Sequence, residues 1–343
     1  DGKVKTKTLA YLGKNKKEAE KRAKEVLDKR GADEKQKSKS KITEESKDEQ
    51  KQPSTAISIE ELAAFCKRKG FVYPSAEIYG GLAGFWDFGH LGVELKNNIK
   101  KEWWKFHVLQ REDIVGIDGS IITNPKVWEA SGHVDSFVDV AVVNKKTKEK
   151  FKVDKFEAEK YKNDPRFEVE GEFNPMFTTN VGPIVSDSIK SYLRPETAQL
   201  IFTNFKAVYE NARLKLPCGI AQIGKAFRNE IAPRDFLFRA REFEQMEIEY
   251  FIKKEMKCLY EIPDEEVLVY SAEAQEQNRE PVAMKIKHAL EKRIIKKDWH
   301  AYWLATELKW FKKLGANKDN FRIRQHLKSE LSHYSSDTWD LEY

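Results

Sequence analysis

Residues 219–251, GIAQIGKAFRNEIAPRDFLFRAREFEQMEIEYF, decide the fold of this chain. They predict two strands joined by a loop. The first strand is apolar and spans 220–230, and the second spans 239–251. The loop between them contains Pro233 and Asp235, a turn-prone pair. The stretch therefore indicates a β-hairpin.

The second predicted strand alternates with period two, and both of its faces carry charge. One face holds Arg239, Arg241, Phe243, Gln245, Glu247 and Glu249, and the other holds Glu242, Glu244, Met246, Ile248 and Tyr250. A half-buried strand ordinarily has one apolar side, because a buried charge needs a partner or a ligand. The pattern indicates either a hairpin that binds a ligand or a solvated edge hairpin with ion-paired rungs.

The hairpin resembles motif 2 of the class II aminoacyl-tRNA synthetases, and its wording is close to that of glycyl-tRNA synthetases. The resemblance rests on Phe-Arg-Asn-Glu at 227–230 and Arg-Glu-Phe-Glu-Gln-Met-Glu at 241–247. It implies that Arg228 bridges the ATP α-phosphate and the amino-acid carboxylate. It also implies that Glu230 receives the adenine amino group and that Glu247 helps to hold the substrate ammonium. A guanidinium suits the first role because it grips phosphate and carboxylate bidentately and offsets charge as pyrophosphate departs.

The same resemblance implies a wider set of site residues, with Arg228 as the catalytic one. The expected ATP-binding residues are Arg228, Asn229, Glu230, Phe238, Arg239, Arg241, Glu242 and Phe243, and the expected glycine-binding residues are Glu196, Phe243, Gln245 and Glu247. We expect Mg²⁺ to bridge the phosphates, and we expect no metal site built from the protein. Lys152, in Phe-Lys-Val-Asp at 151–154, stands where the family often has a substrate-contacting arginine, and lysine lacks the bidentate fork.

The segment upstream of the hairpin predicts a second element of the family. Ser58 and Glu61 form a capping-box signal for a helix that ends at Gly70, and the glycines at 80–92 indicate a tight loop. A helix over 93–109 and a strand over 113–123 that closes on Pro125 resemble motif 1, the dimerisation element. The runs EIYGGLAGFWDFGHLGVELKNNIKKEWW and NPKVWEASGHVDSF resemble the family too. We interpret His90 and His133 as structural hydrogen-bonding residues, because neither has metal-ligand spacing.

Other segments divide the rest of the chain. Residues 140–175 form a charged, irregular insertion, and 252–320 form a helical insertion whose aromatic stripe at 299–310 suggests core packing rather than a nucleic-acid stacking platform. Arg-Pro-Glu-Thr at 194–197 suits the first turn of a helix, and the resemblance adds that Glu196 points at the amino-acid pocket. Residues 321–343 are expected to return to the catalytic core.

Composition limits the class of protein. Residues 1–52 hold 17 Lys+Arg and 11 Asp+Glu, and the remainder holds 45 of each, so the basic excess belongs to the N-terminal extension. That extension is expected to be helical near Lys14–Arg30 and a linker over 32–52, and it either attracts nucleic acid or serves as a solubilising segment. The three cysteines lie far apart, which suits a reducing cytoplasm. We see no apolar run long enough for a membrane span and no secretory signal.

These observations predict an α/β (α+β) fold. Residues 53–251 are expected to form a catalytic core with an antiparallel sheet flanked by helices, and a helical insertion follows at 252–320. The expected function is ATP-dependent activation of glycine and its transfer to tRNA(Gly) by a cytoplasmic homodimer. The family's motif 3 and anticodon-binding domain are not found in this sequence, so we expect the chain alone to make little glycyl-adenylate. The alternatives are a non-catalytic tRNA- or RNA-binding fragment, a subunit of a split synthetase, and another carboxylate-activating ligase. Paired Glu196 and Glu247 argue against the last, because they suit a substrate with an α-amino group.

Overall fold

A computed structural model describes residues 57–136, 138–153, 158–233, 236–332 and 335–343. The chain divides into two units, residues 1–56 and 57–343. The helix expected at Lys14–Arg30, the linker expected at 32–52, Asp154 of the Phe-Lys-Val-Asp run and Asp235 of the loop lie outside the described residues. The description below concerns the second unit.

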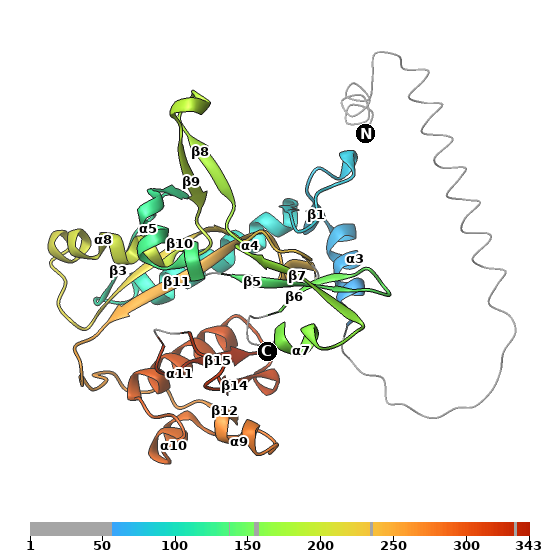
Figure 1. Ribbon diagram of the computed structural model, residues 1–343. Helices are drawn as coiled ribbons and strands as arrows, with labels where there is room; N and C mark the ends of the chain where they lie inside the picture. Colours follow the sequence, from blue (N-terminus) through green and yellow to red (C-terminus); the bar gives the residue numbers. More distant parts are fainter. Residues whose placement is uncertain (1–56, 137, 154–157, 234–235, 333–334) are drawn as a thin grey trace, which may run out of the picture. The chain divides into compact units, whose positions relative to one another are not determined.

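The predicted hairpin forms the centre of this unit (Figure 1). Strands β10 (Cys218–Phe227) and β11 (Glu242–Phe251) pair antiparallel over their whole length. Strand β3 (Ile114–Gly116) adds to β10 in parallel, which gives the order β11-β10-β3. The first strand begins two residues before its predicted range and ends three residues short of it, and the second begins three residues later than predicted, because Glu230 and Arg239 belong to the connection. The expected α/β fold, a hairpin sheet flanked by helices, is confirmed.

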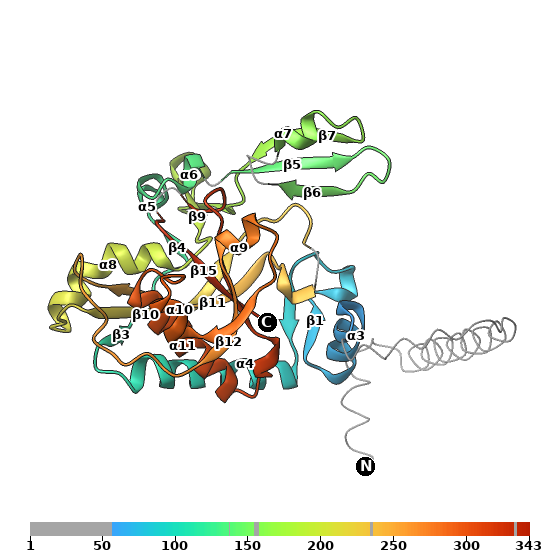
Figure 2. The same ribbon diagram turned by 90° about the horizontal axis from the view of Figure 1, so that it is seen from below.

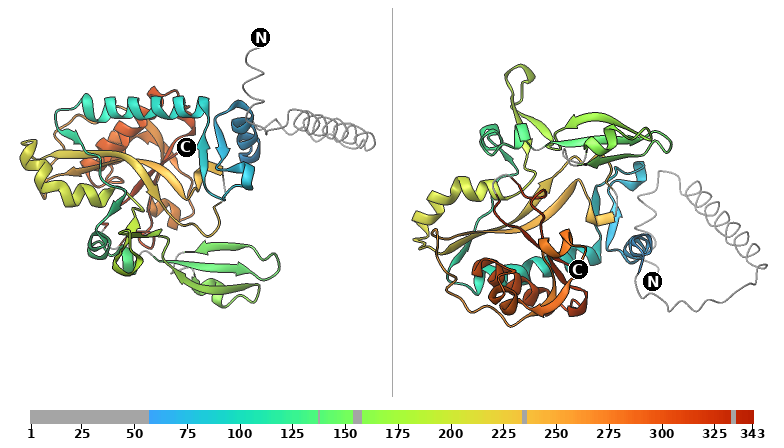
Figure 3. Two further views of the ribbon diagram at one scale, coloured as in Figure 1. Left: turned by 90° about the horizontal axis from the view of Figure 1, so that it is seen from above. Right: turned by 60° about the horizontal axis from the view of Figure 1, so that its bottom comes forward.

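Two long helices cover one face of this sheet. Helix α4 (His90–Trp104) continues through a π-helical turn, η2 (Lys105–Leu109), and runs across the strands, as Figure 3 shows in cyan. Helix α11 (Asp298–Lys313) packs beside it. Trp103 and Trp310 meet the sheet residue Ala221 in a shared core. The predicted helix over 93–109 is confirmed and begins three residues earlier than expected.

The approach to α4 depends on close backbone packing. Helix α3 (Ile59–Lys69) carries the predicted capping box at Ser58 and ends at Gly70, which adopts φ 79°. Strands β1 (Val72–Pro74) and β2 (Trp86–Phe88) then pair, with the short helix η1 (Glu77–Tyr79) between them. A tight loop was expected over 80–92, but the second half of this range forms β2 and the first turn of α4 instead. A Cβ on Gly92 would lie 1.9 Å from the carbonyl oxygen of Phe71, so the contact requires glycine.

The strand predicted over 113–123 is divided between two sheets. Its start is β3, and its end is β4 (Ile122–Thr123), which pairs with β9 (Ile189–Leu193). Strand β8 (Thr178–Val181) completes that sheet, and η3 (Val185–Asp187) connects β8 to β9. Gly119 lets the intervening chain pass close to Leu200, where a Cβ would lie 2.5 Å from Cδ1. Pro125 does not end a strand but begins helix α5 (Pro125–Ala130), which α6 (His133–Ser136) follows.

The insertion predicted to be irregular is a small sheet with its own core. Strands β5 (Asp139–Asn144), β6 (Lys150–Val153) and β7 (Phe167–Phe173) pair in the order β6-β5-β7, and helix α7 (Ala158–Lys162) packs on them. Val140, Val142 and Val153 are buried between them. The charged residues alternate with these apolar ones, which is why composition alone suggested an irregular segment.

Residues 252–343 also differ from expectation. Strands β12 (Glu266–Tyr270), β13 (Val282–Lys285), β14 (Arg322–Gln325) and β15 (Trp339–Glu342) form one sheet in the order β13-β12-β14-β15. Helices α9 (Ala272–Glu276), α10 (Ile286–Glu291) and α11 and the short η5 (Lys318–Asn320) accompany it. The segment is thus not wholly helical, and 321–343 complete this sheet rather than pair with β10 and β11. Val267, Val269 and Ile323 are buried against α10 and α11, so burial drives the pairing.

A single carboxylate joins three parts of the chain. Asp113, beside β3, accepts hydrogen bonds from Arg111 Nε at 2.9 Å, from the Tyr250 hydroxyl of β11 at 2.5 Å and from the Tyr260 hydroxyl at 3.0 Å. Burial opposes ionisation of Asp113, but these donors outweigh it and lower the pKa of Asp113 below its ordinary value. Trp299, Tyr302 and Trp310 of α11 are buried, so the aromatic stripe is core packing.

Candidate active site

The register of the hairpin separates its two faces as the sequence predicts. Glu247 lies opposite Gln222, and Phe243 lies opposite Ala226. Phe243, Gln245, Glu247 and Glu249 share one face because they alternate along β11. The other face packs on α4, where Lys96 Nζ and Lys100 Nζ lie 2.8 and 2.7 Å from the carboxylate of Glu244.

Helix α8 (Ala198–Asn211) lies beside the hairpin (Figure 2), and Glu196 and Thr197 directly precede it. The hydroxyl of Thr197, the residue before α8, donates a hydrogen bond to Glu247 Oε2. Glu196 Oε1 accepts a hydrogen bond of 2.5 Å from Gln199 Nε2 and lies 3.3 Å from His133 Nε2. The expected pair of carboxylates is therefore assembled from two separate elements.

Three carboxylates on this face differ in how readily they ionise. Burial opposes ionisation of Glu196, but hydrogen bonds from His133 and Gln199 outweigh it and lower its pKa. Burial raises the pKa of Glu247, to which the negative charge of Glu196 adds, although the bond from Thr197 opposes this. Burial and the charges of Glu247 and Glu196 raise the pKa of Glu249 to about 7. Such a group of carboxylates favours a cationic ligand.

Arg228 lies beside these carboxylates. Its Nε donates to the Pro195 carbonyl oxygen at 3.1 Å, and its guanidinium carbon lies 5.4 Å from the centre of the Phe243 ring. Its positive charge favours ionisation of both Glu196 and Glu247, although burial still leaves the pKa of Glu247 raised. The structure thus brings together four of the residues predicted from the sequence: Arg228, Phe243, Glu196 and Glu247.

Glu230 and Arg241 lie at the mouth of the same hairpin. Glu230 is 7% exposed, and its Oε2 lies 3.5 Å from Lys152 Nζ, which also pairs with Asp139 at 2.9 Å. Lys152 therefore links the β5–β7 sheet to the hairpin. The Arg241 guanidinium donates to the Glu230 carbonyl oxygen at 2.9 and 2.7 Å and to the Ala83 carbonyl oxygen at 2.9 Å. It holds the connection in place through the main chain.

Several predicted site residues do not join this group. Glu242 lies on the α4 face of β11, where it pairs with Lys225. Phe238, in the short helix η4 (Phe236–Phe238), is 75% exposed, and Arg239 is exposed beside it. Asn229 is fixed by its main chain, whose N–H donates to the Pro175 carbonyl oxygen at 2.7 Å. Gln245 lies on the site face, but its Oε1 is buried without a hydrogen-bond partner in the described part of the chain.

The structure adds residues that the sequence did not assign to the site. His133, Thr197 and Gln199 position the two glutamates, as described above. Gln222, opposite Glu247, is fully buried, and neither polar atom of its side chain has a hydrogen-bond partner among the described residues. Buried Arg194 donates to the carbonyl oxygens of Lys225 and Gly119, each at 2.6 Å. His133 and Thr197 stood within quoted motifs, but only the fold shows which side chains they meet.

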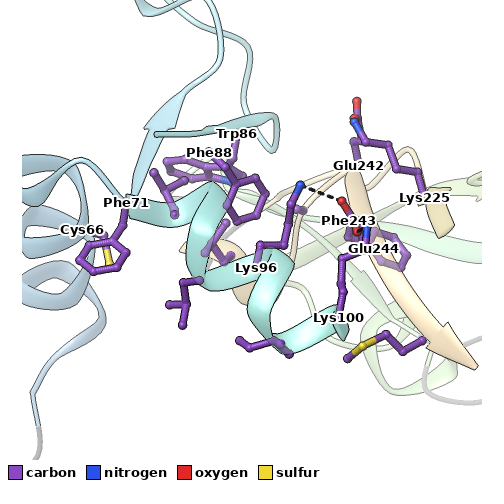
Figure 4. A pocket seen from close by; sticks show the side chains of 17 residues that line it. Cys66, Phe71, Trp86, Phe88, Lys96, Lys100, Lys225, Glu242, Phe243 and Glu244 are labelled. Atoms are coloured by element: carbon purple, nitrogen blue, oxygen red, sulfur yellow. Dashed lines mark hydrogen bonds and ion pairs between the residues drawn. The ribbon is translucent and has the colours of Figure 1, made fainter. Parts of the chain in front are cut away.

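A separate cavity of about 440 Å³ lies on the α4 side of β11 (Figure 4). Its lining is largely apolar and includes Trp86, Phe88, Leu95 and Met246, with Lys96 paired to Glu244 at one edge. The face with the paired glutamates is the other face of the strand. This cavity is therefore not the candidate active site.

Among the described residues, no three His, Cys, Asp or Glu side chains are arranged to hold a metal ion. No helix in the described ranges has both the length and the apolar character needed to cross a membrane.

Comparison with known proteins supports the resemblance inferred from the sequence. The chain is 44% identical to the glycine–tRNA ligase of Thermobifida fusca over 301 residues, which are 82% of this chain and 57% of that protein. It is 42% identical to the glycine–tRNA ligase of Geobacillus kaustophilus over 319 residues, covering 84% and 61% of the two chains. The chain thus spans about three fifths of the length of these relatives.

Two further comparisons add little. No family model matches the chain. The RNA-binding domain of threonyl-tRNA synthetase from Cryptosporidium parvum Iowa II matches 50% of this chain and 33% of its own, with a TM-score of 0.33 and 18% identity.

The resemblance to the aminoacyl-tRNA synthetases is confirmed by the curated relatives. Within that class the chain resembles the glycine–tRNA ligases, as its hairpin wording indicated.

Proposed function

We propose that this chain contributes to a glycine–tRNA ligase, which activates glycine with ATP to glycyl-adenylate and transfers the glycyl group to tRNA(Gly). The observation that carries the proposal is the position of Arg228 beside Glu196 and Glu247 on one face of the hairpin. A guanidinium next to paired carboxylates suits an amino acid, whose two ends carry opposite charges. Relatives that are 44% and 42% identical to this chain are named glycine–tRNA ligases, which supports the proposal.

Glycine would lie with its ammonium toward Glu196 and Glu247 and its carboxylate toward Arg228. Arg228 would then also reach the α-phosphate of ATP and stabilise charge that develops as pyrophosphate leaves. Because glycine has no side chain, the site must reject larger residues. The Phe243 ring would leave little space for a side chain near the α-carbon, and the charge of the paired carboxylates would disfavour an apolar one.

ATP would extend along the hairpin toward its connection, with adenine near Glu230, whose side chain is buried beside Lys152. Asn229, Phe238, Arg239 and Arg241 lie in or beside that connection. Mg²⁺ would accompany the phosphates of ATP. Bound there, the ion would neutralise phosphate charge.

The α4 face supports a homodimer as part of the same proposal. Phe88 and Leu95 line the apolar cavity of Figure 4 and are 41% and 51% exposed, and Leu91, in the first turn of α4, is 43% exposed. A contiguous exposed apolar surface of this kind marks a protein interface. The free cysteines Cys66, Cys218 and Cys258 fit the reducing environment of the cytoplasm, where we place the protein.

The decisive experiment is Arg228→Ala in the full-length protein, assayed by glycine-dependent ATP–pyrophosphate exchange. We expect a loss of about a hundredfold or more, since removal of one preorganised charge-stabilising donor has that effect. Arg166→Ala, at an exposed arginine paired with Asp164, is the matched control and should retain full exchange. Exchange by Arg228→Ala within a few-fold of the unaltered protein would refute the proposal. It would favour the non-catalytic RNA-binding alternative.

A further inference from the structure

His133 belongs to the Ser-Gly-His run at 131–133, which the proposed function leaves without a role. The run follows α5 and opens α6, away from the hairpin in sequence. In the fold, however, His133 Nε2 lies 3.3 Å from Glu196 Oε1. This places an imidazole directly behind one of the two glutamates that face the proposed substrate.

The His133 ring is fixed on its other sides. Its Nδ1 lies 2.9 Å from the Ser131 hydroxyl, which is itself 3.3 Å from the Trp128 carbonyl oxygen. The ring packs edge-on against fully buried Trp128, with centroids 5.5 Å apart. The side-chain amide of Asn174 donates to the His133 carbonyl oxygen at 2.7 Å. Ser131 and Trp128 therefore orient the ring, Asn174 holds its main chain, and together they set the direction in which Nε2 points.

The contact with Glu196 defines where the proton lies. An ionised carboxylate only accepts hydrogen bonds, so at this separation of 3.3 Å the ring stabilises Oε1 when Nε2 carries the proton. Gln199 Nε2 donates to the same oxygen at 2.5 Å. In the described part of the chain no hydrogen bond reaches Glu196 Oε2. The two donors thus hold Oε1 and leave Oε2 for a cationic ligand.

We propose that His133 is a positioning residue of the amino-acid site, which donates from Nε2 to Glu196 Oε1 and so directs Oε2 toward the ammonium group of glycine. The inference rests on the proposed function, because it needs Glu196 to bind an ammonium. We expect its effect on glycine rather than on ATP, because Nε2 contacts Glu196, the carboxylate that faces the ammonium group in the proposed site.

The test compares two amides at position 133 in the full-length protein. In His133→Gln the amide nitrogen takes the place of Nε2 and can still donate to Glu196, whereas in His133→Asn it matches Nδ1 and cannot reach. We expect His133→Asn to raise KM for glycine by about tenfold or more, the usual cost of losing a hydrogen bond to a charged group. KM for ATP should change by less than about twofold, and His133→Gln should stay within about threefold of the unaltered protein.

A double-mutant cycle with Glu196→Gln separates positioning from a structural role. If His133 acts through Glu196, His133→Asn should change KM for glycine by less than about twofold in the Glu196→Gln background. Equal losses in both backgrounds, an equal rise in KM for ATP, or no effect of His133→Asn would each overturn the inference. If His133→Asn fails to fold, Ser131→Ala removes the Nδ1 contact, together with the Ser131 bond to the Trp128 carbonyl oxygen, and leaves the Nε2 contact in place; it should give a smaller rise in KM for glycine alone. No glycine-specific rise in Ser131→Ala would likewise overturn it.

The same cycle distinguishes this inference from the proposed function. If Glu196→Gln itself leaves KM for glycine unchanged, the assignment of the ammonium site fails. If Glu196→Gln is impaired and His133→Asn is not, only the role of His133 fails.

Discussion

Glu249 offers a test that needs folding but not catalysis. Its carboxyl group lies on the site face of β11, and burial together with the charges of Glu247 and Glu196 raises its pKa from 4.5 to about 7. The folded state therefore favours the neutral form. The stability that this provides is fully present below pH 4.5 and is lost as the pH rises through about 7.

The magnitude follows from the two pKa values. A rise of the pKa from 4.5 to about 7 corresponds to about 3 kcal/mol of stability, because a shift of one pKa unit is worth about 1.4 kcal/mol. Glu249→Gln keeps the shape of the neutral carboxyl group and cannot ionise. We expect it to match the unaltered chain at pH 4.5 and to exceed its free energy of unfolding by up to about 3 kcal/mol at pH 8.5.

Urea unfolding of residues 57–343 followed by tryptophan fluorescence at pH 4.5, 7 and 8.5 measures this difference. Glu276→Gln, at an exposed glutamate of α9, is the matched control and should run parallel to the unaltered chain at every pH. Glu247→Gln should reduce the difference in the free energy of unfolding between pH 4.5 and 8.5, because it removes one of the charges that raise the pKa of Glu249. Parallel curves for Glu249→Gln and the unaltered chain would refute the reasoning.

Three further substitutions probe the site, the interface and the core. Thr197→Val removes the hydrogen bond that favours ionised Glu247, so the pH at which glycine binding rises should shift upward in a pH series of KM for glycine; an unshifted profile would contradict this. Leu95→Glu should convert the proposed dimer to a monomer in sedimentation velocity, whereas Leu259→Glu, at a leucine that is 65% exposed, should not; a persisting dimer would place the interface elsewhere. Trp310→Ala should lower the free energy of unfolding by about 3–5 kcal/mol in urea, because the ring is 2% exposed in the core between α11 and the sheet; a cost below about 1 kcal/mol would refute that packing.

The elements that could be predicted from the sequence are those encoded locally. The capping box at Ser58, the stop at Gly70 and the alternation along 242–251 depend on neighbouring residues, and each appears where expected. The two faces of β11 follow from its period of two. That periodicity correctly placed Phe243 and Glu247 together, and it also placed Glu242 on the opposite face, against its predicted contact with ATP.

What sequence could not provide is the pairing of distant segments. Residues 113–123 read as one strand, but their two ends find partners in different sheets. The sequence of residues 321–343 resembles the catalytic core of the family. In the structure, however, β14 pairs with β12 of the insertion, because Ile323 is buried in the core of that sheet. Lys152 and His133 reach the site from elements whose approach depends on the whole fold. Arg241 was expected to contact ATP, and its main-chain partners at Ala83 and Glu230 could not be read from spacing.

The carboxylate of Asp113 has a consequence for how the molecule opens. Arg111 next to β3, Tyr250 of β11 and Tyr260 all donate hydrogen bonds to it, and Arg111 also donates to the Tyr302 hydroxyl of α11. None of these segments can therefore separate without leaving a partly buried charge short of donors. Amide protons in β11 and in α11 should therefore exchange with solvent through the same opening event and with similar protection, rather than through two independent local openings. The hairpin that carries Glu247 would then share the protection of the segment that follows it, and the proposed glycine site would be rigid before any ligand arrives.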